Sequence, residues 1–263
     1  MGLKISQVDA FTDRPFAGNP AAVCVLPEAR ETEWMQNVAQ EMNLSETAFL
    51  VKENDLYNLR WFTPGIEVEL CGHATLASAH VLWEEGHLEP DQQARFSTRS
   101  GILTADRIGS QIELDFPAVT ESASDPADGL LEGLGIDAVY VGRNRMDYLV
   151  EVASEEILRA MTPNFSQLKS VDVRGIIVTS KASRSGLDFV SRFFAPNSGI
   201  DEDPVTGSAH CSLGPYWRKH LNKDSFTAYQ ASARGGTVKV RLVDDRVRLA
   251  GSAVTVMRGE LLI

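Results

Sequence analysis

Short stretches in which apolar and polar residues alternate recur along the whole chain, and such alternation is typical of strands that bury one face. Turn residues separate many of them, as at Thr12-Asp13-Arg14-Pro15 and Thr63-Pro64-Gly65. The pattern predicts strands over residues 5–11, 21–26, 48–51, 57–62, 95–97, 102–108, 111–116, 138–141, 148–152, 175–180, 187–194, 237–242, 246–250 and 254–263.

Helical spacing of apolar residues predicts helices over residues 31–42, 72–85, 155–161 and 207–221. The second of these has few polar positions, which is the pattern of a buried helix. Two of the helices begin at a glycine, Gly72 and Gly207. The amides of a first helical turn have no partner within the helix and lie at the positive end of its dipole. Both starts are therefore suited to receive an anion.

The two halves of the chain resemble each other. Three short motifs occur twice in the same order: 60–64 again at 192–196, 72–74 at 207–209, and 97–101 at 232–236. The last two pairs share one spacing, which favours an internal duplication. The alternative is two unrelated α+β halves that use the same turn chemistry.

A duplication predicts an α+β fold of two pseudo-symmetric domains, each a mixed sheet curled around one central helix. The polar segment 117–129 is the candidate linker. We therefore expect domains over residues 1–118 and 119–263, with the extreme C-terminus able to pack back on the first domain. The two glycine-opened helix starts are then expected to face a common cleft, the usual place for a small-molecule site.

Composition narrows the choice of partner. The chain has 263 residues, 43% of them hydrophobic, and a net charge of −11. This acidic balance argues against nucleic acid or an anionic membrane as a partner, and leaves a small-molecule substrate. Three widely spaced cysteines without a Cys-x-x-Cys pair suit a reducing cytoplasm. We expect neither a secretory leader nor a membrane span.

Three side chains are candidates for chemistry. Glu46 lies at a helix-to-strand junction, where a partly desolvated carboxylate is able to act as a general acid/base. His73 lies on the first turn of the buried helix, where burial and the helix dipole are expected to lower the pKa of its imidazole. Asp203 precedes the second glycine-opened helix. Each also has a purely structural interpretation, as a loop glutamate, a satisfied buried histidine or a helix N-terminal anion.

No known cofactor motif supplements these groups. The sequence contains no Walker loop, no Gly-x-Gly-x-x-Gly after a strand and no Gly-x-Ser-x-Gly. His73 and His80 share a helix face without a third ligand cluster, so we predict no metal.

Several motifs resemble the signature of the PhzF-like family, which is named for a phenazine-biosynthesis isomerase and belongs to the diaminopimelate-epimerase-like superfamily. They are Asp9-Ala10-Phe11, Phe16-Ala17-Gly18-Asn19-Pro20, Leu44-Ser45-Glu46-Thr47-Ala48, Thr63-Pro64, Cys71-Gly72-His73-Ala74-Thr75 and Asp203-Pro204-Val205-Thr206-Gly207-Ser208-Ala209. They occur in the family's order and span most of the chain.

The resemblance implies two barrel-like α+β domains, no cofactor and a homodimer. The enzyme that gives the family its name isomerises trans-2,3-dihydro-3-hydroxyanthranilate by moving a proton between ring carbons. By motif, Glu46 corresponds to the proton-shuttling carboxylate, and His73 and Asp203 correspond to groups that bind and polarise the substrate. The anion pocket corresponds to Ser208 with the amides of Gly72 and Gly207, and Asn19 is a further candidate for it.

A second mechanism of the superfamily uses two cysteines, one from each domain, in racemases and epimerases. Cys71 stands at the first position, and the repeat spacing places Thr206 at the second. Because a threonine hydroxyl is too weak an acid to replace a thiol, half of that machinery is missing. We therefore predict a cofactor-independent isomerase. The alternatives are a cysteine-dependent racemase or epimerase, or a non-catalytic small-molecule-binding protein.

Overall fold

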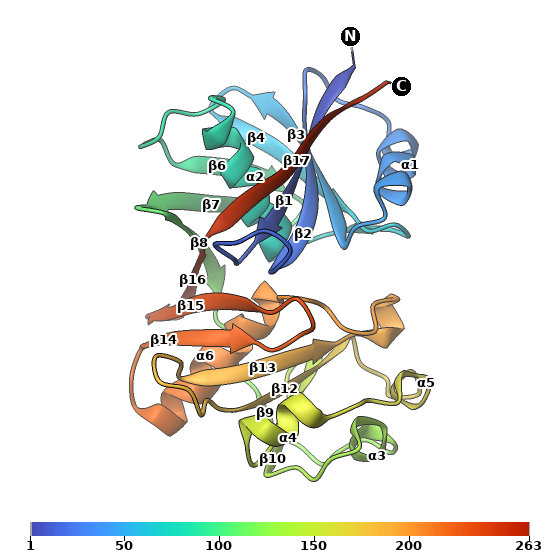
Figure 1. The fold of residues 1–263 in the computed structure, drawn as a ribbon, viewed down its shortest axis with the longest axis vertical. Helices are drawn as coiled ribbons and strands as arrows, with labels where there is room; N and C mark the ends of the chain where they lie inside the picture. Colours follow the sequence, from blue (N-terminus) through green and yellow to red (C-terminus); the bar gives the residue numbers. More distant parts are fainter. Residues whose placement is uncertain (1, 263) are drawn as a thin grey trace. The chain divides into compact units, whose positions relative to one another are not determined.

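The computed structural model describes residues 2–262 of the chain and divides it into two compact units. One unit comprises Met1–Phe116 together with Arg248–Ile263, and the other comprises Pro117–Val247. Strand β17 belongs to the first unit because it pairs antiparallel with β1, and the red β17 and blue β1 lie side by side in Figure 1.

The first unit is a curved mixed sheet around a helix. Its strands are β1 (Leu3–Ala10), β2 (Asn19–Leu26), β3 (Glu46–Glu53), β4 (Leu56–Phe62), β5 (Glu67–Val68), β6 (Ala94–Thr98), β7 (Gly101–Ile108), β8 (Gln111–Pro117) and β17 (Ala253–Leu261). Helix α2 (Gly72–Glu84) packs on β1, β2 and β3, while α1 (Thr32–Met42) packs on β3 and β4. Met35, Val38 and Phe49 belong to the core beneath α1.

Helix α2 confirms the prediction of a buried helix over residues 72–85, because ten of its thirteen residues are buried. Its hydroxyl groups are satisfied within the helix. Thr75 Oγ1 donates to the carbonyl of Cys71 at 2.6 Å, and Ser78 Oγ donates to that of Ala74 at 2.7 Å. Such internal pairing removes most of the desolvation cost of a buried hydroxyl.

The second unit repeats this plan. Its strands are β9 (Ser122–Ala123), β10 (Tyr140–Arg143), β11 (Asp147–Glu151), β12 (Gly175–Lys181), β13 (Phe189–Phe194), β14 (Ser225–Gln230) and β15 (Gly236–Val243), and β16 (Arg246–Gly251) contains the boundary to the first unit. Its helices are α3 (Leu130–Leu134), α4 (Glu155–Ala160), α5 (Phe165–Leu168), the short 3₁₀ helix η1 (Pro196–Ser198) and α6 (Gly207–Leu221). Helix α6 is buried over most of its length, as predicted for a second central helix.

Strand pairing supports the duplication. In the first unit the neighbouring strands run in the order β1, β2, β3, β4, β6 and β7, and their pairings alternate between antiparallel and parallel, beginning and ending with an antiparallel pair. In the second unit the order is β10, β11, β12, β13, β14 and β15, and the pairings alternate in the same way. The repeated motif at 60–64 and 192–196 also makes the same contacts in both units. Arg60 pairs with Glu67 at 2.7 Å, and Arg192 pairs with Glu202 at 2.7 Å.

The structure also contains elements that the sequence did not predict. Strand β14 buries Phe226, Ala228 and Gln230, a face too weakly apolar to stand out in the sequence. Helices α3 and α5 have five and four residues, which is too short for a helical period to show.

No helix among residues 2–262 combines the length and the apolar character that crossing a membrane requires.

Candidate functional site

Three predicted residues of the first unit meet at one point. Glu46 is the first residue of β3, Asn19 is the first residue of β2, and His73 lies in the first turn of α2. His73 Nε2 lies 2.9 Å from Glu46 Oε2, and His73 Nδ1 lies 3.1 Å from Asn19 Nδ2. The side chains of His73 and Glu46 are only 5% and 12% exposed. The imidazole is therefore held from both ends in a site that excludes most water.

A strained loop places Asn19. Gly18 has a φ of +65°, and a Cβ there would lie 2.1 Å from the carbonyl oxygen of Ala10. Only glycine allows this close approach. Phe16 also has a positive φ, of 67°, and its amide donates to Asp9 Oδ2 at 2.8 Å. A buried carboxylate thus fixes the loop that leads to Asn19.

The neighbours of His73 decide its protonation. Burial alone lowers the pKa of the imidazole, whereas Cys71 and Glu46 raise it, and the resulting pKa is well above the usual 6.5. Cys71 is the larger of the two causes of the rise, and the Glu46 carboxylate is the second. The expectation of a lowered pKa for His73 is wrong, because it took account of the helix and burial but not of these two neighbours.

Asn19 suits either state of the ring, because an amide presents a donor on one side and an acceptor on the other. Its Nδ2 donates to Nδ1 of a neutral His73. Its oxygen, turned to the same place, accepts from Nδ1–H of the imidazolium. Asn19 therefore orients the ring without requiring one charge state.

Cys71 lies against the same ring as an unreactive thiol. Its Sγ is 3.5 Å from His73 Nδ1 and 4.0 Å from Nε2. Burial, followed by the nearby Glu46 charge, raises the pKa of Cys71 to about 11 although His73 opposes the rise. Burial also raises the pKa of Cys24 and Cys211 to about 12. All three cysteines are free and buried.

The prediction of no metal was based on His73 and His80, but the structure brings a different set together. One ligand atom from each of Glu46, Cys71 and His73 lies within 4.8 Å of the other two. A cation there would have to displace the proton of a thiol whose pKa is about 11 and separate Glu46 from His73. The donor set therefore fits the close Glu46–His73 contact better than a bound metal.

In the second unit the predicted residues surround the start of α6. Asp203 Oδ2 accepts a hydrogen bond from Thr206 Oγ1 at 2.5 Å. Gln230, which is fully buried, donates to the Asp203 carbonyl at 2.7 Å and accepts from the Thr206 amide at 2.8 Å. Gly207 is the first residue of α6 and Ser208 is the second. The side chain of Ser208 contacts Arg174, whose Nη2 donates to Ser208 Oγ at 3.2 Å.

Two functional candidates were missed from the sequence. Gln230 lies in the unpredicted strand β14, and Arg174 directly precedes β12 without belonging to any recognised motif. The duplication could have pointed to Arg174, because this residue lies in the part of the second half that corresponds to the surroundings of Glu46. The three matched motifs do not extend to that part of the repeat, so the sequence alone did not reveal the correspondence.

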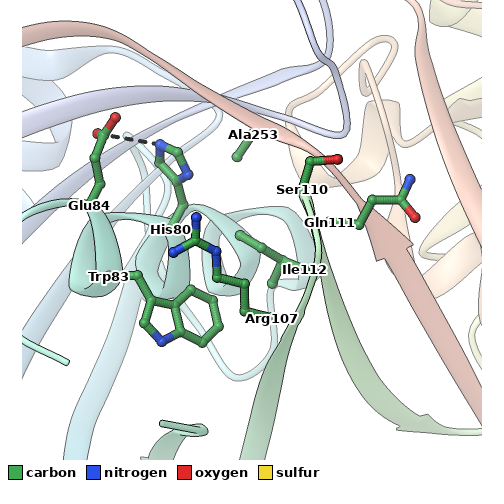
Figure 2. A pocket seen from close by; sticks show the side chains of 8 residues that line it. All are labelled: His80, Trp83, Glu84, Arg107, Ser110, Gln111, Ile112 and Ala253. Carbon is green, nitrogen blue, oxygen red and sulfur yellow. Dashed lines mark ion pairs between the residues drawn. The ribbon is translucent and has the colours of Figure 1, made fainter. Parts of the chain in front are cut away.

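A separate cavity of about 260 Å³ lies in the first unit, and Figure 2 shows the side chains that line it. They include His80, Trp83 and Glu84 from α2, and Arg107 from β7. Burial lowers the pKa of His80, which Glu84 opposes and Arg107 reinforces. None of the predicted site residues lines this cavity, so it is not the place of the proposed chemistry.

Comparison with known proteins agrees with this picture. The family model described as phenazine biosynthesis-like protein matches residues 8–259. A Halalkalibacterium halodurans protein named as an uncharacterized isomerase is 59% identical over 264 residues, covering 100% of both chains. The crystal structure of an Enterococcus faecalis phenazine biosynthesis protein of the PhzF family has a TM-score of 0.95, 42% identity and 100% coverage of both chains.

A probable proline racemase from Agrobacterium radiobacter, at 10% identity and a TM-score of 0.69, shows the same fold alone; it covers 99% of this chain and 93% of its own. Fold and pairing thus define a two-unit α+β protein of the diaminopimelate-epimerase-like class. Within that class, the chain belongs to the phenazine biosynthesis-like, or PhzF, family, and an isomerase-like function is supported.

Proposed function

We propose that this protein is a cofactor-independent isomerase that moves a proton between two carbons of a small, carboxylate-bearing metabolite. Glu46 is the acid/base. The observation that supports it most directly is the buried contact between Glu46 and His73, at 2.9 Å. A single carboxylate, held in place and shielded from water, is what a proton transfer along one face of a substrate requires.

The proposed reaction involves only the substrate and Glu46, and the proton removed from one carbon is returned to another. A substrate C–H bond breaks, its proton moves to a Glu46 oxygen, and the electron pair joins the adjacent unsaturated system. The same oxygen then returns the proton to a second carbon, where a new C–H bond forms. His73, whose pKa is raised, lies 2.9 Å from this carboxylate and is proposed to act as an imidazolium. Its charge also stabilises the anionic electron system that develops between the two steps.

Binding is assigned to the remaining motif residues. Asp203 is proposed to polarise the substrate, and the amides of Gly72 and Gly207 with Ser208 bind its anionic group. These amides belong to the first turns of α2 and α6, where backbone donors are unpaired within the helix. Asn19 orients His73. We also propose a homodimer, which sedimentation equilibrium checks.

The two-cysteine mechanism is disfavoured on physical grounds. It needs a thiolate on one face of the substrate carbon and a second thiol on the other. The pKa of Cys71 is about 11, and Thr206 donates its hydroxyl to Asp203. Neither group is a usable acid/base near neutral pH.

Hydrogen exchange tests the proposal. The protein is incubated in heavy water with trans-2,3-dihydro-3-hydroxyanthranilate and with a panel of small unsaturated carboxylates, and carbon-bound deuterium is followed by mass spectrometry. We expect isomerisation with the wild type and a loss of at least about 100-fold in Glu46→Gln, as for removal of a general acid/base. Glu53→Gln, at the exposed end of the same strand, is the matched control.

An equal rate in Glu46→Gln and wild type would show that the assigned role is wrong. A ligand that binds tightly and is recovered without deuterium would instead indicate a non-catalytic binding protein. Full loss of activity in Cys71→Ala, with inactivation by thiol alkylation, would favour the racemase alternative.

A further inference from the structure

The duplication assigns Glu46 and His73 of the first unit a counterpart in the second. Thr47 pairs with Phe62, and Ile176 pairs with Phe194, the residue that repeats Phe62. Counting back one residue on each strand places Gly175 at the position of Glu46. On the neighbouring parallel strands, Glu46 lies opposite Ala21 and Gly175 lies opposite Asp147.

The helix starts correspond in the same way. Gly207 repeats Gly72, so Ser208 stands at the position of His73. The first unit therefore joins the β3 start to the helix by the Glu46–His73 contact. In the second unit, where glycine replaces the acid, the preceding residue Arg174 makes the equivalent connection, from Nη2 to Ser208 Oγ at 3.2 Å.

Arg174 is held in one orientation by its surroundings. Its Nε and Nη2 donate to the two oxygens of Asp147 at 2.8 and 2.5 Å, and Asp147 is only 1% exposed. Its guanidinium lies over the Phe193 ring, 5.6 Å from the centroid. A Cβ on Gly175 would lie 2.2 Å from Phe193 Cζ, so glycine is needed for this packing.

This arrangement leaves the hydroxyl hydrogen of Ser208 available as a donor. A hydroxyl has one hydrogen and two acceptor lone pairs. Because Ser208 Oγ already accepts from a guanidinium, its own hydrogen is left to point to another acceptor. Within the described residues, Arg174 Nη1 makes no hydrogen bond, and the Arg174 side chain is 37% exposed. Both groups are thus donors without a competing protein acceptor.

We propose that Arg174, acting directly and through Ser208, is the residue that makes this protein select a carboxylate on its substrate. The proposal rests on the proposed function, because it assigns the substrate-recognition half of the duplicated site to the second unit. The first unit uses the shared position for an acid/base pair. The second unit uses it for a cationic donor pair.

A matched pair of probes tests the selection without knowledge of the substrate. Dissociation constants of 2-aminobenzoate and its uncharged analogue 2-aminobenzamide are measured with the full chain by isothermal titration calorimetry. Hydrogen bonds to a charged group correspond to about a ten- to a hundredfold preference. We expect wild type to prefer the carboxylate by that factor. Equal binding of both probes, or binding of neither, overturns the proposal.

The variants must separate recognition from stability. Burial raises the pKa of Asp147 and the Arg174 guanidinium opposes that rise, so Arg174→Gln alone leaves a buried carboxylate without its partner. The double variant Arg174→Gln with Asp147→Asn removes both charges together and keeps the test valid if the single variant does not fold. Arg143→Gln removes another arginine of the same unit that hydrogen-bonds outside the α6 start, and serves as the control.

We expect the carboxylate preference to fall to about threefold or less in the double variant, to fall by a smaller factor in Ser208→Ala because Arg174 is still present, and to stay unchanged in Arg143→Gln. Equal weakening of both probes in the double variant would indicate a structural role only and overturn the proposal. The outcome is independent of catalysis. Glu46→Gln is expected to keep the preference while losing deuterium exchange, so failure of the isomerase proposal and failure of this inference give different results.

Discussion

The Glu46–His73 pair predicts a large and pH-dependent effect on stability. At 2.9 Å and an effective dielectric of about 20, two opposite unit charges attract by about 6 kcal/mol before desolvation is subtracted. Because both side chains are buried, removing one partner leaves an uncompensated charge, which typically costs about 3–5 kcal/mol. We therefore expect Glu46→Gln and His73→Gln each to lower the free energy of unfolding by that amount at pH 6.5.

The double variant should lose less than the sum of the two single variants, because neither charge is then left alone. Urea unfolding of wild type and the three variants, followed by tryptophan fluorescence, measures the cycle. Glu28→Gln is the control, since the Arg30–Glu28 contact is exposed and 3.9 Å long, and such pairs contribute about 0–1 kcal/mol.

The sign of the pH dependence follows from the raised pKa of His73. Between the ordinary histidine pKa and the raised pKa of folded His73, the folded protein holds a proton that the unfolded chain has released. The stability therefore falls as pH rises through this range. The advantage of wild type over Glu46→Gln is fully present below pH 6.5, the ordinary histidine value, and is lost as pH rises through the folded pKa. The ionised pair would be refuted if the stability losses of the two single variants were additive in the double variant. It would also be refuted if the stability advantage of wild type over Glu46→Gln grew with pH.

Three further measurements test other parts of the structure. Gly18→Ala should destabilise the protein by about 1–3 kcal/mol or more in the same urea assay, because Gly18 has a φ of +65° and an added Cβ would meet a carbonyl oxygen. Gly65→Ala is the control and should have little effect, because no atom lies closer than 3.9 Å to the position of an added Cβ. The pKa of Glu155 is lowered to about 2, because hydrogen bonds from Ser183 and then Arg159 outweigh the effect of burial. Its contribution to stability should be present above pH 4.5 and vanish towards pH 2. Glu155→Gln should therefore flatten that part of the acid-unfolding curve. Cys71 should resist iodoacetamide at pH 7.5 in the native state, as peptide mapping by mass spectrometry checks, because burial raises the pKa of its thiol to about 11; rapid labelling would contradict a neutral, enclosed thiol.

Local pattern and motif were enough to predict much of the fold. The alternation at residues 5–11 and the nearly all-apolar run from Gly72 correspond to β1 and the buried α2. Periodicity reports which face of an element is buried, and that property depends on neighbours along the chain. The repeated motifs likewise predicted two similar units, and the strands of both units pair in the same alternation of antiparallel and parallel neighbours.

Pairing between residues far apart in sequence could not be predicted in the same way. Strand β14 was missed, and its Gln230 braces Asp203 and Thr206 from within the unit. The sequence suggested that the extreme C-terminus can pack back on the first domain, but only the structure shows that β17 does so by pairing with β1. Nothing in a local window of sequence records which distant segment completes a hydrogen-bonded network.

The candidate site shows the same division. By itself, the sequence determined which groups are available, a carboxylate at Glu46, an imidazole at His73 and glycine-opened helix starts, because residue types and turn chemistry are local properties. Only the tertiary structure decided their state: Glu46 raises the pKa of His73, burial keeps Cys71 a neutral thiol, and Arg174 reaches Ser208. The physical reason is that charge, desolvation and hydrogen bonding act over a few ångströms through space, and folding sets those distances.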